Sequence, residues 1–119
     1  MIRLALTSLC LTAASLAASS VLAQSYPSKP VHVIVPSAPG GTADFLGRIL
    51  STKMSEAMGV PFVVENRAGA GTNIGNDYVA KSAPDGYTLL VNGITLATNK
   101  ALFNKLPYGP IKDFAPFIS

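Results

Sequence analysis

Two glycine-rich segments contain the residues of this sequence that are best able to bind a ligand. The first glycine loop, residues 36–44, reads PSAPGGTAD, and the second glycine loop, residues 66–75, reads NRAGAGTNIG. Glycines let the backbone turn sharply and bring its N–H groups close to a ligand. We expect a helix to begin in each segment, and the first N–H groups of a helix have no partner within it. Such a helix start favours an anion.

The first glycine loop also has a purely structural interpretation, as a strand-to-helix turn with a good cap. Thr42 is the candidate N-cap of the helix that follows. Asp44 then lies in the first helical turn, where it offsets the helix dipole. It can pair with Arg48 one turn later, which contributes about 0.3–0.5 kcal/mol.

The second glycine loop invites comparison with a dinucleotide-binding fingerprint, which it does not match. Its glycines fall at positions 69, 71 and 75, so the spacing is GxGxxxG and not GxGxxG. No acidic residue for a ribose ends a strand about twenty residues further on, and the first glycine loop lacks the lysine of a P-loop. A nucleotide-binding α/β enzyme fragment is therefore the disfavoured alternative.

No set of residues indicates catalysis. His32 is the one histidine and falls in an expected strand, where a packed or edge role is more typical than that of a base. Ser37 has no histidine partner in reach. Asp77 and Asp85 flank a helix end and a turn, where solvated or capping carboxylates are usual. We expect no enzyme activity, no metal site and no cofactor.

Composition excludes several classes of protein. The 119 residues carry nine Lys and Arg against six Asp and Glu, and 49% are hydrophobic. One cysteine and one histidine exclude a disulfide scaffold and a Cys/His zinc site, and the hydrophobic content excludes an intrinsically disordered chain. The basic residues are scattered singly, which argues against a nucleic-acid partner.

Residues 1–23 resemble a secretory signal peptide. Sixteen of these 23 residues are apolar, the only charge is that of Arg3, and small residues precede Ala23. The alternative is a membrane anchor, but serines and threonines dilute the stretch. We expect cleavage after Ala23, export to the periplasm, and a mature chain without the single cysteine, Cys10, held together by its core alone.

Hydrophobic periodicity predicts alternating strands and helices after a loose lead-in at residues 24–30. Short apolar runs indicate buried strands and three- or four-residue spacing indicates helices. The expected strands are 31–35, 62–66 and 87–91, and the expected helices are 42–58, about 73–82 and a short stretch ending near 103. This order predicts an α/β fold with a parallel sheet flanked by helices. Both glycine loops and a third loop, residues 92–95, then lie at the carboxyl edge of the sheet, where ligands bind.

Four ordered motifs resemble one known family, the Bug-type periplasmic solute-binding proteins, which are substrate receptors of tripartite tricarboxylate transporters. The motifs cover nearly all of residues 26–119. They are PGGTAD (39–44) with Arg48, ENRAGAG (65–71) with Ile74-Gly75, APDGYTLL (83–90), and LPY (106–108) with KDFAP (112–116).

The resemblance implies one lobe of a two-lobed, flytrap-like receptor that binds small carboxylates and delivers them to a membrane permease. In this family, backbone groups of the first two loops hold a ligand carboxylate, partly through water. Carried over to this sequence, the ligand-binding residues are Ser37, Ala38, Pro39, Gly40, Gly41, Thr42 and Asp44, together with Gly71, Thr72, Asn73 and Gly75.

The sequence also departs from the family pattern. Thr72 stands where many members have glycine, so it supplies either a hydroxyl donor or only a cap, and Gly109 replaces an aspartate of the connector, residues 104–119. By resemblance, residues 24–119 form only part of the first lobe and end at the crossover. We therefore expect this chain alone to bind a carboxylate feebly or not at all, and to form a marginal, association-prone fold. A truncated remnant without function is the further alternative.

Overall fold

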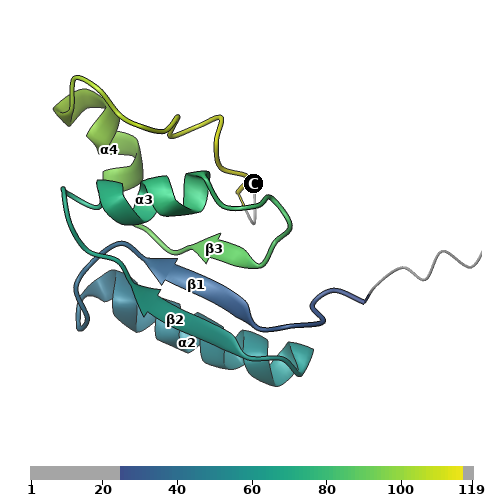
Figure 1. Ribbon diagram of the computed structural model, residues 1–119. Helices are drawn as coiled ribbons and strands as arrows, with labels where there is room; N and C mark the ends of the chain where they lie inside the picture. Colours follow the sequence, from purple (N-terminus) through teal and green to yellow (C-terminus); the bar gives the residue numbers. More distant parts are fainter. Residues whose placement is uncertain (1–24, 117–119) are drawn as a thin grey trace, which may run out of the picture.

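The computed structural model describes residues 25–116 and shows the predicted parallel α/β arrangement (Figure 1). The expected signal peptide lies outside the described residues. Strands and helices alternate along the chain, which confirms the predicted fold class. The elements are β1 (Val31–Val35), α2 (Thr42–Met58), β2 (Phe62–Asn66), α3 (Asn73–Ala80), β3 (Thr88–Leu90) and α4 (Thr95–Leu102).

The sheet has the order β2-β1-β3, with β1 in the centre and both neighbours parallel to it. Val31 of β1 faces Phe62 in the register and Val35 faces Asn66. Val31, Ile34 and Val35 are fully buried, because helices cover both faces of the central strand. The β-branched run of β1 is therefore the centre of the core.

The third strand is shorter than the predicted span of 87–91. Regular strand geometry holds only for Thr88–Leu90. The two flanking residues still pair with β1, because Tyr87 accepts a hydrogen bond from the His32 N–H and the Val91 N–H donates to the carbonyl of Ile34, both at 2.9 Å. The difference concerns the ends of the strand and not its place in the sheet.

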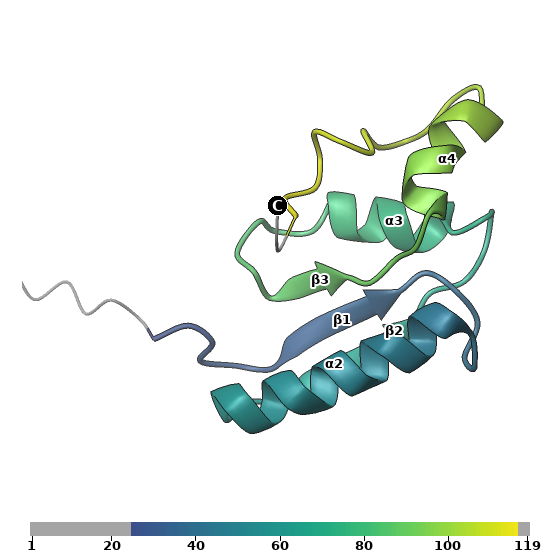
Figure 2. The ribbon, with the colours of Figure 1, turned by 180° about the vertical axis from the view of Figure 1, so that it is seen from behind.

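The helices lie on opposite faces of the sheet, as Figures 1 and 2 show. α2 packs against β1 and β2, and α3 packs against β3 and β1. Gly47 allows α2 to approach closely, since a Cβ there would lie 2.9 Å from a methyl carbon of Val35. Gly59 ends α2 in a left-handed conformation with φ 71°, as the sequence predicts for a C-cap. The predicted N-cap was wrong: Gly41 occupies that position with extended backbone, and Thr42 is the first helical residue.

The lead-in to β1 is not loose, although the sequence predicted it to be. The Tyr26 hydroxyl donates to the Gly86 carbonyl at 2.6 Å, and its ring meets Tyr87 edge-on with 5.2 Å between centroids. The ammonium of Lys29 lies 4.5 Å from the centre of the Tyr87 ring. These contacts join residues far apart in the sequence, so they could not be predicted from the residues next to Tyr26.

The last two helices, α3 and α4, lie next to the connector. α3 ends at Ala80, two residues earlier than predicted, and α4 matches the short helix expected before residue 103. The connector then runs back over α3 (Figures 1 and 2), with Tyr108 only 6% exposed. Within residues 25–116, no helix has the length and apolar character needed to cross a membrane.

Gly75 lies where α3 approaches the end of β1 most closely, so a substitution there tests this packing. A Cβ at this position would lie 2.6 Å from the Pro36 Cβ and 2.9 Å from the carbonyl oxygen of Arg67. Gly75→Ala should therefore lower the free energy of unfolding by about 1–3 kcal/mol, measured by urea denaturation. Gly93→Ala is the matched control, because nothing lies within 4 Å of a Cβ there. Equal stability of the two variants would contradict this packing.

Candidate functional site

The carboxyl edge of the sheet brings the two glycine loops together. The first glycine loop follows β1 and the second follows β2, and these strands pair in parallel from Val31↔Phe62 to Val35↔Asn66. The close approach of Pro36 to Gly75 joins the end of β1 to the start of α3. The predicted placement of both loops at one edge is therefore confirmed, even though their helices cover opposite faces.

Asn66, the last residue of β2, ties the first glycine loop in place. Its side-chain Nδ2 donates to the Ser37 carbonyl at 3.1 Å and to Asp44 Oδ1 at 2.9 Å. Its Oδ1 accepts a hydrogen bond from Arg48 Nη2 at 3.3 Å. One amide side chain thus joins β2 to both ends of a loop that follows β1, a role that sequence reasoning did not assign.

The Asp44 carboxylate is directed into the first glycine loop. Asp44 is 4% exposed, and its Oδ2 accepts hydrogen bonds from Arg48 Nε and the Gly40 N–H, both at 3.0 Å. The hydrogen bond from Arg48, followed by those from Gly40 and Asn66, lowers the pKa of Asp44 to about 2. The predicted Asp44–Arg48 pair is confirmed, and the carboxylate and the Gly40 N–H are occupied within the loop.

Backbone donors remain at the start of each helix. Among residues 25–116, the N–H groups of Gly41, Thr42 and Ala43 at α2 have no acceptor, nor do those of Thr72, Ile74 and Gly75 at α3. The hydroxyl of Ser37 is buried and likewise lacks a partner in this part of the chain. Donors without acceptors at a helix start suit the oxygen atoms of an anion.

The second glycine loop has a left-handed backbone at four successive residues. The φ angles are 131° at Gly69, 48° at Ala70, 61° at Gly71 and 76° at Thr72. Gly69 has a second requirement, because a Cβ there would lie 2.5 Å from Ile74 Cδ1. Left-handed backbone at the two non-glycine residues costs on the order of 1–3 kcal/mol each, so surrounding contacts must hold the loop.

Those contacts come from a set of buried and half-buried neutral side chains, here called the amide network: Asn73, Asn76, Asn92 and Asn99, with Thr72, Thr95 and Tyr108. Asn99 Nδ2 donates to the Gly71 carbonyl at 2.7 Å and to Asn73 Oδ1 at 2.8 Å. The Tyr108 hydroxyl donates to Asn73 Oδ1 and accepts from Asn76 Nδ2. Asn92 Nδ2 donates to Asn76 Oδ1 at 2.8 Å. The network joins α3, the third loop, α4 and the connector behind the second glycine loop.

Thr72 stands at the predicted cap position, but its hydroxyl is bonded to other side chains. It occupies the N-cap position of α3, but its side chain forms no capping hydrogen bond. Its hydroxyl donates to Thr95 Oγ1 and accepts from Asn76 and Asn99, at 3.2–3.3 Å. The hydroxyl therefore belongs to the amide network, and only the backbone N–H of Thr72 is left without an acceptor among the described residues.

A separate charged cluster lies beside β1 and β2. His32 is about half-exposed and its Nδ1 is 2.5 Å from Glu65 Oε1, which lowers the pKa of Glu65. Arg67 pairs with the other oxygen of Glu65 and stacks on Tyr78, with 3.7 Å between the guanidinium carbon and the ring centre. Within residues 25–116, no three His, Cys, Asp or Glu side chains gather as metal ligands.

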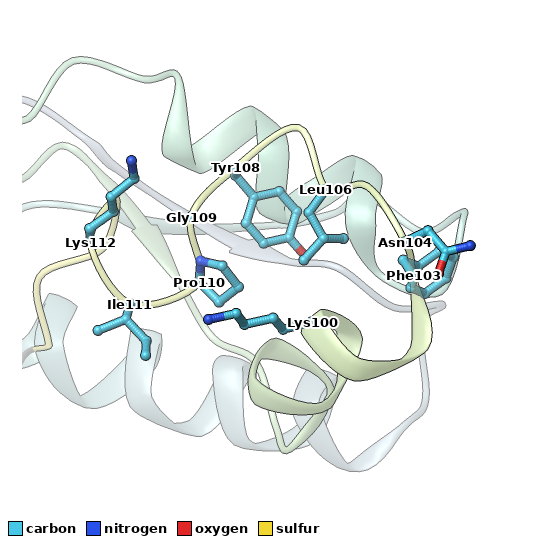
Figure 3. A pocket seen from close by; sticks show the side chains of 9 residues that line it. All are labelled: Lys100, Phe103, Asn104, Leu106, Tyr108, Gly109, Pro110, Ile111 and Lys112. Carbon is cyan, nitrogen blue, oxygen red and sulfur yellow. The ribbon is translucent and has the colours of Figure 1, made fainter.

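A surface hollow of about 480 Å³ lies between the end of α4 and the connector. Figure 3 shows Lys100 lying beside Pro110 and the Lys112 side chain pointing away from it. The other lining residues are mainly apolar, so the hollow presents no converging polar groups. It is not a candidate for anion binding.

Comparison with known proteins yields one family and several relatives. Residues 46–119 match the family described as "Tripartite tricarboxylate transporter family receptor". BugT of Bordetella pertussis is 45% identical over 101 residues, which is 83% of this chain and 31% of BugT. A UPF0065 protein from the tcbD-tcbE intergenic region of Pseudomonas sp. is 42% identical over 109 residues, 89% of this chain and 32% of that protein. The chain thus spans about a third of the length of these curated relatives.

Solved structures show the same fold. The periplasmic binding protein BugD superposes with a TM-score of 0.73 at 40% identity, covering 76% of this chain and 30% of BugD. A Rhodopseudomonas palustris protein with adipate gives 0.69 at 37% identity, over 71% of this chain and 29% of that one. MatC from the same organism, with bound malate, gives 0.67 at 40% identity, over 76% and 31%.

The lowered pKa of Asp44 predicts acid sensitivity. Its folded value of about 2 lies below the ordinary 3.8, so near pH 3 the unfolded chain binds more protons than the folded chain. The contribution of Asp44 to stability should be full above about pH 4 and should disappear as the pH falls to 2. Asp44→Asn should lower the urea midpoint at pH 6 and flatten its fall between pH 4 and 2.

Glu56→Gln is the control for this measurement, because it removes an exposed carboxylate from the same helix. Glu56→Gln should leave the fall of the urea midpoint between pH 4 and 2 unchanged. An unchanged pH profile in Asp44→Asn would show that the Asp44 contacts do not stabilise the first glycine loop.

Proposed function

Because the chain belongs to the tripartite tricarboxylate transporter receptor family, we propose that it binds small carboxylate anions between its two glycine loops. The family and the named structural neighbours are solute-binding receptors and not enzymes, which disfavours the nucleotide-enzyme alternative. The observation that carries the proposal is the pair of helix starts at one sheet edge, each with N–H groups that have no acceptor among residues 25–116.

The donors available suit a carboxylate in number and strength. A hydrogen bond to a charged group contributes about 1.5–3 kcal/mol, and micromolar affinity requires about 8 kcal/mol. Three or four such bonds approach this total before the cost of association is subtracted. A site open on one side therefore gains from a facing lobe, and we propose that this chain supplies one half of a two-lobed site.

The residues predicted to bind the ligand divide into two groups in this proposal. The direct donors are the N–H groups of Gly41, Thr42, Thr72 and Gly75, with the hydroxyl of Ser37. The others shape the loops: Ala38 and Pro39 by their backbone path, Gly40 and Asp44 through their mutual hydrogen bond, Gly71 through its carbonyl, and Asn73 through its side chain.

Two neighbours indicate the ligand class. Their structures contain adipate and malate, which are both dicarboxylates. We propose a small di- or tricarboxylate as the ligand, captured outside the cytoplasmic membrane and passed to a membrane permease. Removal of residues 1–23 after Ala23 would release the chain into the periplasm, where the neighbour BugD is placed by its description.

The ligand class is tested by calorimetry on the full chain with adipate and malate. The dimethyl ester of adipate is the control ligand, because it keeps the carbon skeleton and removes both charges. We expect heat from at least one dicarboxylate and none from the ester. Equal binding of the ester, or binding of neither acid, would contradict the proposed function.

Thr42 allows one proposed donor to be deleted with little change of shape. Proline is tolerated at the first helical position, and Gly41 before it already has the extended backbone that proline requires, with φ −80° and ψ 171°. Thr42→Pro should weaken dicarboxylate binding about tenfold, because one charge-assisted hydrogen bond is lost. Thr42→Ala keeps the N–H and should bind within about twofold of the unaltered chain. Equal affinities of the two variants would remove Thr42 from the site.

A further inference from the structure

Asn99 lies in α4, yet its side chain is bound into the second glycine loop. Its Nδ2 donates to the carbonyl of Gly71 at 2.7 Å and to Asn73 Oδ1 at 2.8 Å. Asn99 is 2% exposed, so water does not compete for these bonds. The two amide hydrogens of Asn99 are thus directed mainly at these two oxygens, with Thr72 Oγ1 a longer contact at 3.3 Å, and they set the position of the Gly71 carbonyl.

The orientation of that carbonyl also sets the orientation of an N–H group. The peptide between Gly71 and Thr72 is planar and trans, so its C=O and N–H point in opposite directions. Because the Gly71 oxygen points towards Asn99 in α4, the Thr72 N–H points away from α4. This N–H has no acceptor among residues 25–116, and the free N–H groups of Ile74 and Gly75 follow it.

The loop backbone does not fix this orientation by itself. Gly71 has φ 61°, and a glycine adopts positive and negative φ about equally well, so its peptide is free to turn over. Thr72 has φ 76°, a conformation that a β-branched residue avoids unless its surroundings impose it. Selection of this one arrangement therefore depends on contacts from outside the loop.

We propose that Asn99 is a positioning residue of the ligand site, which holds the Gly71–Thr72 peptide so that the Thr72 N–H faces the bound carboxylate. This inference rests on the proposed function. The rest of the amide network supports Asn99, because Asn73 Oδ1 is itself fixed by the Tyr108 hydroxyl. α4 thus contributes to the site without contact between its side chains and the ligand.

Asn99→Asp tests the proposal, because it keeps the side-chain shape and places an acceptor against two acceptors. Asn99→Leu has a similar size, removes both donors and adds no charge, so it serves if the aspartate variant does not fold. Asn104→Asp is the matched control, since Asn104 is exposed and outside the network. Adipate and malate affinities are measured by calorimetry below the melting temperature of each variant, and the Thr72 amide is followed by ¹H–¹⁵N NMR on the full chain.

The expected result is an affinity reduced at least tenfold in a folded Asn99 variant. Its Thr72 amide resonance should be displaced in the absence of ligand and should no longer shift on addition of ligand, while Asn104→Asp behaves as the unaltered chain. A merely structural role would lower the melting temperature without this local change. A folded Asn99 variant that binds within twofold of the unaltered chain, or that keeps the Thr72 resonance, overturns the proposal.

Failure of the proposed function would look different. If the unaltered chain binds neither acid, the carboxylate assignment is refuted, and with it the role of Thr72 as a ligand donor. The ligand-free spectra then still decide whether Asn99 sets the peptide: a displaced Thr72 resonance in the Asn99 variant supports that part, and an unchanged one refutes it.

Discussion

Parallel pairing of three short strands is the constraint on which the rest of this structure depends. Because β2 and β3 both run in the same direction as β1, every strand-to-helix turn falls at one edge of the sheet. Helix starts that belong to opposite faces become neighbours there, and their unsatisfied N–H groups accumulate. The chemistry of the site therefore comes from backbone geometry, and few charged side chains are required.

The two glycine loops reach their shapes by different means. The first is held by charge, with the Asp44 carboxylate bonded to Arg48, the Gly40 N–H and Asn66. From Gly71 onwards the second is held by the neutral side chains of the amide network, whereas Arg67 near its start pairs with Glu65. Acid should therefore loosen the first loop more than the part of the second loop that the amide network holds.

Local patterns sufficed for the elements and for the location of the site. Each of these features can be predicted from a few neighbouring residues: the β-branched run of β1, the periodic apolar residues of α2 and the glycines after each strand. The amide network could not be foreseen, because Asn73, Asn76 and Asn99 look like surface residues in the sequence and become partners only when α3 and α4 meet. For the same reason the attachment of Tyr26 to Gly86, sixty residues apart, was missed. N-cap preferences favour a hydroxyl side chain, and they therefore predict Thr42 as the cap of α2. In the structure the cap is Gly41, so the helix begins one residue earlier than a Thr42 cap would place it.

The buried Tyr108 side chain couples the connector to the second glycine loop. Its hydroxyl is shared between Asn73 and Asn76 on α3, and its ring lies edge-on to Phe114. A displacement of the connector is transmitted to the first turn of α3 through these hydrogen bonds, because the Tyr108 side chain is buried and cannot move independently of its partners. Whatever displaces residues 104–116 therefore also displaces the loop backbone, and a carboxylate held there, as proposed above, would resist that displacement in return.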